Sequence, residues 1–207
     1  INLDNWNRKE HFKFFSALDD PFWGITTTVD FTSIYQQSKN MEVSFFLYSV
    51  HFLLKCINAT TAFKLRIENG EVVEYDKINI SPTIGREDGT FGFGFFEYDT
   101  DLSLFIENAE KEIHRVKNST GLSFSKDTAR ADVIRYSALP WFAFSEMKHA
   151  GSIQTGDSIP KISTGKLIQE KKRLLLPISI SVHHGLVDGR NVAEFIQNVK
   201  DGQNNTL

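Results

Sequence analysis

The sequence of 207 residues has only one cysteine, Cys56. A single cysteine excludes an intramolecular disulfide framework and excludes zinc sites built from several cysteines. Cys56 lies within the apolar stretch FFLYSVHFLLKCIN. Free cysteines in such stretches are commonly buried, so we expect an inert thiol without a chemical role.

The sequence also lacks a large excess of positive or negative charge. The formal net charge is −3, and the longest basic run is KKR at residues 171–173. Nucleic-acid binding needs clustered positive charge, which this sequence lacks. The basic run precedes the apolar segment LLLPISIS and indicates a solvated turn between two strands. A contact with a phosphorylated ligand is the alternative interpretation.

Long hydrophobic runs are missing as well. No apolar run approaches the ~20 residues that a membrane span needs, and residues 1–12 have no apolar signal-peptide core. We therefore expect a cytoplasmic protein. The five prolines are scattered, and there is no repeat or flexible linker. The sequence predicts one continuous domain over residues 1–207.

Phenylalanine is abundant, with 18 residues, which predicts a large aromatic core or an apolar pocket. Alternating apolar residues predict strands, and apolar residues at helical spacing predict helices. The tight-turn pair Asn69-Gly70 predicts that two of these strands form a hairpin. The order of the elements predicts an α/β protein, with helices packed on a mixed sheet. The expected strands are 25–31, 63–67, 72–75, 133–138 and 174–183, and the expected helices are 44–58, 102–116 and 192–199.

Residues 89–96 read GTFGFGFF. The spacing and the absence of a following amphipathic helix exclude a dinucleotide-binding loop. Instead, the pattern predicts a strand with its phenylalanines, Phe93 among them, on one face and Gly92 and Gly94 on the other. Glycines on a strand face allow a close approach to the backbone. Either a neighbouring strand or a ligand can occupy that space.

Two adjacent histidines end the last predicted strand, in the segment SVHHGLVDGR. If the strand continues one residue further, His184 points to the apolar side and His183 to the polar side. A histidine where a strand meets a glycine-containing loop can act as a neutral general base near pH 7. Asp188, four residues later, can orient it or brace its loop. A hydrogen-bonded core histidine is the alternative. Metal ligation and a serine-hydrolase triad both lack their characteristic spacings.

The segment HHGLVDG, residues 183–189, resembles the H-H-x-x-x-D-G signature of the chloramphenicol acetyltransferases, which the catalytic cores of dihydrolipoamide acyltransferases share. Other segments favour the first family. NLDNWNRKEHFKFF at 2–15 is similar to its W-x-R-x-x-H-F opening, and YSALPW at 136–141 is similar to its S-A-x-P-W segment. LLLPISISVHH at 174–184 is similar to the strand before the signature. The matches follow the family's order over nearly the whole chain.

This resemblance implies a coenzyme A-dependent acyltransferase fold. It implies direct transfer from acetyl-CoA, the cosubstrate, to the 3-hydroxyl of a small acceptor, with chloramphenicol expected. It also implies antibiotic resistance as the biological role, no metal, and a homotrimer with active sites at the subunit interfaces. By position, His184 is the general base and Ser137 the donor to the oxyanion, while Asp188 pairs with Arg8 as structural support. The remaining implied site residues are Phe14, Phe15, Phe93 and Ser163 for the acceptor and Lys166 for the cosubstrate.

The resemblance weakens after Trp141. The segment that follows is shorter and more polar than in the family, with Lys148 and His149 where apolar residues are expected. Leu167 replaces an aromatic residue that contacts adenine. The chemistry is therefore better supported than the acceptor. The alternatives are a different hydroxyl or thiol acceptor, a dihydrolipoamide acyltransferase-like core, or a non-catalytic ligand-binding homologue.

Overall fold

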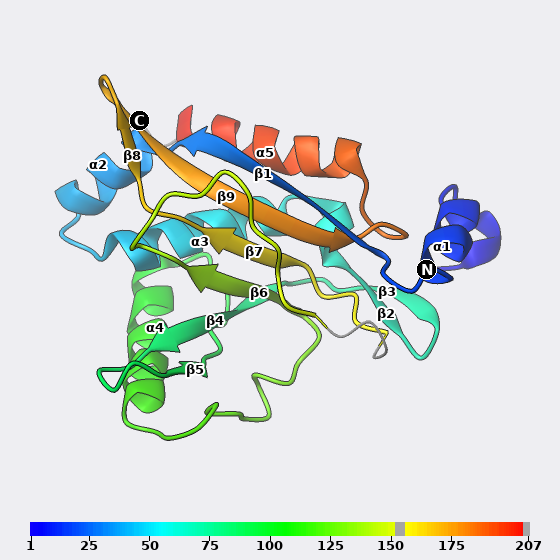
Figure 1. Cartoon of the computed structure of the whole chain (residues 1–207), viewed down its shortest axis with the longest axis horizontal. Coiled ribbons are helices and arrows are strands. Elements are labelled where there is room, and N and C mark those ends of the chain that lie inside the picture. Colours follow the sequence, from blue (N-terminus) through cyan, green and yellow to red (C-terminus); the bar gives the residue numbers. More distant parts are fainter. Residues whose placement is uncertain (152–155, 205–207) are drawn as a thin grey trace.

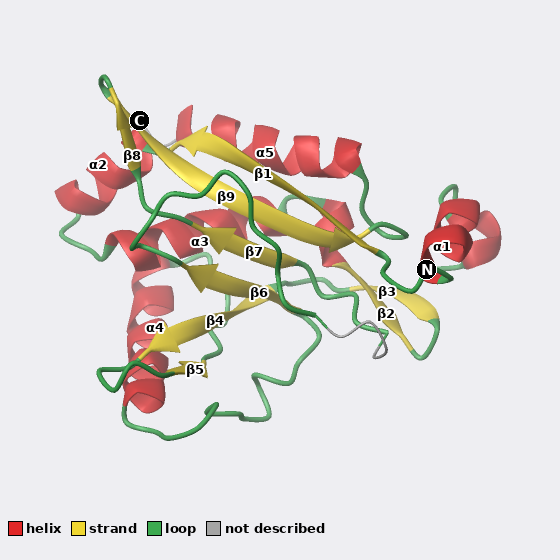
Figure 2. Ribbon diagram, in the orientation of Figure 1, coloured by secondary structure: helices red, strands yellow, loops and turns green. Residues whose placement is uncertain are grey.

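The structure is a computed structural model that describes residues 1–151 and 156–204. A mixed sheet of seven strands runs through it (Figures 1 and 2). Its strands are β1 (Phe22–Asp30), β4 (Asn79–Gly85), β5 (Phe91–Phe93), β6 (Val133–Ala138), β7 (Lys161–Thr164), β8 (Ile168–Glu170) and β9 (Arg173–His183). They lie in the order β1-β9-β7-β6-β4-β5, with β8 paired to β9. β4, β6 and β7 are parallel, and the other pairs are antiparallel.

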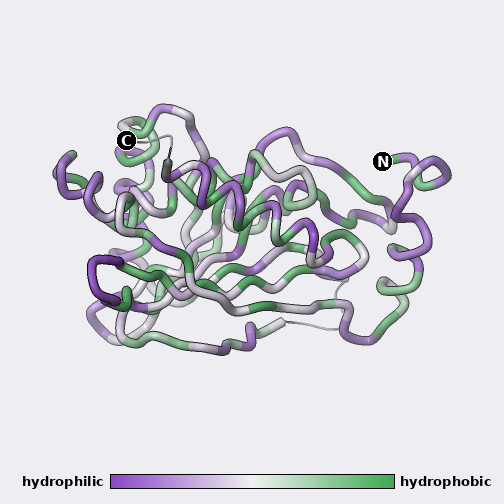
Figure 3. The backbone as a smooth tube through the Cα atoms, turned by 90° about the horizontal axis from the view of Figure 1, so that it is seen from above, coloured by the Kyte–Doolittle hydropathy of each residue, from purple (hydrophilic) through white to green (hydrophobic). Residues whose placement is uncertain are grey.

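The helices are α1 (Lys9–Ser16), α2 (Thr32–Asn40), α3 (Phe45–Asn58), α4 (Leu102–Lys117) and α5 (Gly189–Asn204), with short 3-10 helices η1 (Leu3–Asn5) and η2 (Thr61–Lys64). α3 and α5 lie on one side of the sheet, while the long connection from β6 to β7 crosses the opposite face (Figure 2). α1 projects with the N-terminus from one end of the molecule (Figures 1 and 3). The predicted α/β class, helices packed on a mixed sheet, is confirmed.

The two faces of the sheet differ in chemistry because strand side chains alternate. On β9, Ile178, Ile180 and Val182 are buried in the core together with residues of α3 and α5. The opposite face carries hydroxyls. Ser137 on β6 is paired with Ser163 on β7, and Ser163 is paired with a further serine on β9. The helices therefore cover the apolar face, and the polar face is left for the β6–β7 connection.

A tight turn joins β2 (Leu65–Glu68) to β3 (Glu71–Glu74), the hairpin that the sequence predicts. Its two central residues, Asn69 and Gly70, have positive φ angles of 52° and 82°. Such angles are those of the primed turns that suit hairpins. Arg66 anchors this hairpin: its fully buried guanidinium donates to the carbonyls of Phe63, Leu65, Ala131 and Val133.

Most predicted elements are confirmed, with some ends displaced. The strand expected over 25–31 begins at Phe22 and ends at Asp30. Phe31 leaves the strand because the Asp30 carboxylate accepts the backbone N–H of Thr32, 3.0 Å away, and turns the chain into α2. The helix expected over 192–199 is the central part of the longer α5. The sequence patterns do not predict α1, α2, β4 or β7.

The glycine-rich strand is shorter than predicted, because β5 ends at Phe93. A Cβ atom on Gly92 would lie 2.5 Å from the Arg86 side chain, and one on Gly94 would lie 2.7 Å from the Ile84 side chain. Ile84 belongs to β4, and Arg86 follows that strand directly. Ser123 and Val116 of α4 also lie 2.5 and 2.8 Å from the Gly92 position, so protein side chains fill the space beside both glycines.

Lys171 forms the turn between β8 and β9 with a positive φ of 53°, as the solvated-turn interpretation of the basic run predicts. Cys56 is buried, and burial raises the pKa of its thiol to about 12. Within the described ranges, no helix combines the length and apolar character needed to cross a bilayer.

Candidate active site

The first half of the site is the turn that follows β9. The strand ends at His183, and His184 enters the turn with its backbone N–H donated to the carbonyl of Pro21, 2.8 Å away. The His184 ring stacks on Phe15 of α1, with centroids 3.9 Å apart and planes at 24°. On another side lies the Trp23 ring, 5.4 Å away between centroids. His184 is half-buried between these two aromatic rings.

The placement of the two histidines differs from the strand-based expectation. His184 does not point into the apolar core, because the strand ends one residue earlier. His183 is the buried histidine, only 3% exposed, and its Nδ1 accepts the backbone N–H of Gly185. Burial lowers the pKa of His183 to about 4, although the negative charge of Asp157 acts in the opposite direction. His183 is therefore a neutral structural residue at neutral pH.

The two ring nitrogens of His184 have different surroundings. Nδ1 is buried and has no hydrogen-bond partner among the described residues. Nε2 is not among the buried unpaired atoms of the described residues. An imidazole nitrogen with a free lone pair can accept a proton from a hydroxyl group.

Arg8 and Asp188 hold this turn in place. Their side chains form an ion pair, and Arg8 Nη2 donates to the backbone carbonyl of His184, 3.2 Å away. Asp188 also caps α5 by accepting the backbone N–H groups of Arg190 and Asn191, at 2.9 and 3.2 Å. Partial burial alone would raise the pKa of Asp188, but the hydrogen bond from Arg8 and those from the helix lower it overall. Asp188 is therefore an anion that links α1 to α5.

The second half of the site is the row of hydroxyls on the polar face. The Thr83 hydroxyl donates to Ser137 Oγ, 3.1 Å away, which leaves the Ser137 proton free to donate elsewhere. Ser163, on the neighbouring strand, is fully buried, and its Oγ lies 3.0 Å from Nε2 of His149. His149 comes from the β6–β7 connection, so this connection is fastened to the hydroxyl row.

A cavity of about 530 Å³ opens on the same face, between β1, β9 and residues 145–151. Pro21 and Trp23, which both contact His184, form one wall, and His149 and Lys161 form another. The cavity therefore connects the surroundings of His184 with the residue that contacts Ser163.

Charges around this cavity are largely compensated. Lys161 Nζ lies 3.4 Å from the Asp157 carboxylate and 4.4 Å from the centroid of the Phe22 ring. Asp157 also accepts a 2.8 Å hydrogen bond from Arg135. Glu146 and Lys148, of opposite charge, also line the cavity.

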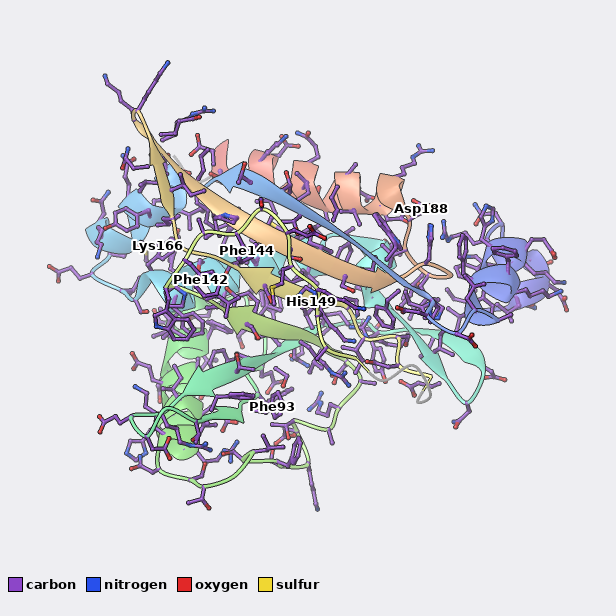
Figure 4. The ribbon with its side chains drawn as sticks, in the orientation of Figure 1. Phe93, Phe142, Phe144, His149, Lys166 and Asp188 are labelled. Atoms are coloured by element: carbon purple, nitrogen blue, oxygen red, sulfur yellow. The ribbon has the colours of Figure 1, made fainter. Side chains whose placement is uncertain are left out.

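Within one chain, His184 and Ser137 lie far apart. Ser137 is opposite Ser163, which is opposite Ser179, so two strand spacings of about 4.8 Å separate Ser137 from Ser179. His184 lies further along the chain from Ser179, by about 16 Å at the rise of a strand. The direct separation is about 19 Å, which neither side chain can bridge. Figure 4 shows the same geometry, with Asp188 near one end of the sheet and Lys166 and Phe142 toward the other.

Exposed aromatic residues occur at both ends of the molecule. Phe14 is 64% exposed and packs edge-on against Phe15, beside His184. At the other end, Phe93 stacks on Phe124, which is 70% exposed, and Trp141 is 73% exposed.

Lys166 is exposed at the end of β7 where the row of hydroxyls ends, and its backbone N–H donates to the carbonyl of Phe142, 2.9 Å away. Phe144 lies beside the preceding glycine, Gly165. Lys166 is accordingly far from Asp188, in the turn after β9 of the same chain (Figure 4). In the described part of the chain, no group of three or more His, Cys, Asp or Glu side chains could hold a metal ion.

The sequence profile of the chloramphenicol acetyltransferase family matches residues 1–200. The chain belongs to the chloramphenicol acetyltransferase family. It is therefore an acyltransferase, as the resemblance implied.

Several members of the chloramphenicol acetyltransferase family are similar over their full length. "Chloramphenicol acetyltransferase 3" of Escherichia coli is 28% identical over 208 residues, covering 100% of this chain and 97% of the relative. The chloramphenicol acetyltransferase of Clostridioides difficile is 27% identical, covering 97% of this chain and 93% of the relative. A solved structure of a chloramphenicol acetyltransferase superposes with a TM-score of 0.89 at 29% identity, covering 98% of both chains.

The fold extends beyond the chloramphenicol acetyltransferase family. A probable dihydrolipoamide acetyltransferase of Listeria monocytogenes superposes with a TM-score of 0.70 at 13% identity, covering 95% of this chain and 89% of that one. At this identity the likeness shows the fold alone. It confirms the coenzyme A-dependent acyltransferase fold that the shared H-H-x-x-x-D-G signature implied.

Proposed function

We propose that this chain transfers the acetyl group of acetyl-CoA to the 3-hydroxyl of chloramphenicol and thereby confers resistance to the antibiotic. The main support is the family match over residues 1–200, together with a half-buried histidine held between two aromatic rings. Acetyl-CoA is a cytoplasmic metabolite, so the proposed site of action is the cytoplasm.

In the proposed reaction, His184 Nε2 takes the proton of the acceptor hydroxyl while its oxygen attacks the thioester carbonyl. Ser137 donates a hydrogen bond to the oxyanion that forms, and Thr83 keeps its hydroxyl oriented by donating to it. Such a donor in a site without water contributes about 3–4 kcal/mol to lowering the barrier. Collapse breaks the carbon–sulfur bond, and His184 returns the proton to the departing thiolate. No covalent acyl-enzyme is needed.

The separation of about 19 Å between His184 and Ser137 requires a second chain in this mechanism. His184 and Phe14 lie at one end of the molecule, and Ser137, Phe93 and Lys166 lie toward the other. A head-to-tail contact between copies brings the two ends together, and such heterologous contacts form a closed ring when the rotation between copies closes. We propose that the ring is a homotrimer, with three active sites shared between neighbouring subunits. Phe14, Phe15, Phe93 and Ser163 then surround the acceptor, and Lys166 lies near the cosubstrate.

The activity is tested by thiol release from acetyl-CoA with chloramphenicol, followed by mass spectrometry of the product. The expected product is the 3-O-acetyl ester, and His184→Ala should abolish its formation while acetyl-CoA binding is retained. His114→Ala, on the exposed face of α4, is the matched control and should remain fully active. Substantial turnover by His184→Ala would remove the proposed base.

Subunit sharing is tested by complementation between two impaired variants. His184→Ala and Ser137→Ala are mixed at equal amounts, dissociated and reassembled. A shared site is intact when its His184 comes from a Ser137→Ala subunit and its Ser137 comes from a neighbouring His184→Ala subunit. Random mixing makes roughly a quarter of the shared sites intact in this way. Recovery of that fraction of wild-type activity is expected. Activity no higher than the average of the two separate variants would contradict a shared site.

A different acceptor alcohol or thiol is the second candidate, favoured by the polar residues His149, Lys148 and Lys161 around the cavity. Turnover in a screen of alcohols and thiols, without turnover of chloramphenicol, would support it.

A further inference from the structure

His149 is a polar residue in the wall of the cavity between β1, β9 and residues 145–151. It lies on the part of the chain that carries Ser137 and Ser163, which the proposed trimer places against His184 of the neighbouring subunit. It belongs to the β6–β7 connection, where the resemblance implies apolar side chains in contact with the acceptor. One of its ring nitrogens, Nε2, lies 3.0 Å from Oγ of the fully buried Ser163. The imidazole ring is therefore fixed between the sheet and the cavity (Figure 4).

The other ring nitrogen of His149 has no partner. Nδ1 is buried, and among residues 1–151 and 156–204 nothing forms a hydrogen bond with it. Burial and the nearby positive charge of Lys161 both lower the pKa of His149, so the ring is neutral at neutral pH. A neutral imidazole has one donor and one acceptor nitrogen, and Ser163 occupies only one of them. An unpaired buried nitrogen is costly, which points to a missing partner.

We infer that the partner of His149 Nδ1 is a polar group of the bound acceptor, and that this contact determines which alcohols the cavity takes. Building on the proposed function, the structure assigns the acceptors to alcohols that carry a second, neutral hydrogen-bonding group. Chloramphenicol, with an amide and a secondary hydroxyl besides the acetylated one, belongs to this class. A neutral group is favoured because Asp157 already compensates the charge of Lys161, 3.4 Å away.

Two substitutions separate a contact with the acceptor from a role in positioning Ser163. His149→Asn keeps a polar atom near the position of Nδ1 and loses the contact with Ser163. His149→Gln keeps a polar atom near Nε2 and loses the one that faces the acceptor. His149→Leu removes both polar atoms at similar volume. His114→Leu makes the same chemical change on the exposed surface of α4 and serves as the control.

The readout is the dissociation constant of chloramphenicol measured by isothermal titration calorimetry, with acetyl-CoA binding and the melting temperature as checks. We expect the dissociation constant to be about tenfold higher for His149→Leu and His149→Gln. A tenfold change is near the upper limit of what the loss of one hydrogen bond causes. His149→Asn should bind more tightly than both, and His114→Leu should match the wild type.

The inference is wrong if all three His149 variants bind chloramphenicol as the wild type does, or if the Gln variant is normal and the Asn variant is weak. The proposed function is tested separately, by the loss of thiol release in His184→Ala. Wild-type protein that acetylates chloramphenicol while His149 is dispensable overturns the inference alone. Wild-type protein that neither binds nor acetylates chloramphenicol overturns both.

Discussion

Arg8→Ala removes the side chain that joins the start of α1 to the turn after β9. The substitution deletes the ion pair with Asp188 and the hydrogen bond to the backbone carbonyl of His184. Hydrogen bonds to charged groups contribute about 1.5–3 kcal/mol. The Asp188 side chain is 35% exposed, so solvent screening reduces this contribution. We expect a loss of about 2 kcal/mol in the free energy of unfolding.

The assay is thermal unfolding followed by circular dichroism. For a chain of this size, each kcal/mol corresponds to about 2–4 °C, so the melting temperature should fall by about 4–8 °C. All variants are compared at one protein concentration, because the stability of an oligomer depends on it. Activity should fall as well, because the turn that carries His184 loses its brace.

Lys9→Ala is the matched control in the same helix. Its ion pair with Asp4 is 2.7 Å long but exposed, with the Asp4 side chain 84% accessible. Exposed pairs contribute about 0–1 kcal/mol, so the melting temperature should hardly change. If Arg8→Ala and Lys9→Ala melt at the same temperature, the brace between Arg8 and Asp188 does not stabilise the fold.

The contribution of this pair should also depend on pH. Asp188 has a folded-state pKa below the ordinary value of 3.8, through its hydrogen bonds from Arg8 and α5. A carboxyl with a lowered pKa stabilises the fold above its unfolded-state pKa, and this stabilisation disappears as the pH falls through the folded-state value. The difference between wild type and Arg8→Ala should therefore be full at neutral pH and shrink below pH 3.8.

Ser137→Ala should lower kcat by about 10²–10³ with little change in KM, because the oxyanion donor acts only in the transition state; steady-state kinetics that show a raised KM and an unchanged kcat would contradict this. The free energy of unfolding should decrease as the pH is lowered from 6.5 to about 4, because in this range the His183 ring binds a proton in the unfolded chain but not in the folded one. Denaturant unfolding of wild type and His183→Asn across this range tests the effect, and parallel pH profiles would count against it.

The sequence by itself predicts the elements that have a strong local pattern. The apolar stretch that forms α3, the amphipathic α4 and the alternation of β9 all match the structure closely. The turn at Asn69-Gly70 also follows from local chemistry, because few residues adopt its positive φ angles. Short elements such as α1 and β7 have too few residues to establish a period, and their positions follow from packing.

Some features of the candidate site can likewise be predicted from the sequence, and others cannot. The motif around His184 and the pairing of Arg8 with Asp188 can be anticipated from the resemblance to the family, since these segments are similar in sequence. The buried Arg66 could not be anticipated, because its four acceptors are backbone carbonyls that the sequence does not identify as neighbours. Alternation also suggests His184 as the core histidine, and only the end of β9 makes His183 the buried one.

Sequence alone therefore determined the periodic elements and, through the resemblance, the family to which the chain belongs. Only the tertiary structure decided that His184 and Ser137 lie at separate ends of one chain, because that separation depends on strand order and register. It also decided that His149 contacts Ser163 on the polar face of the sheet. That contact joins a loop to a strand, and no local pattern specifies how a loop folds back over a sheet.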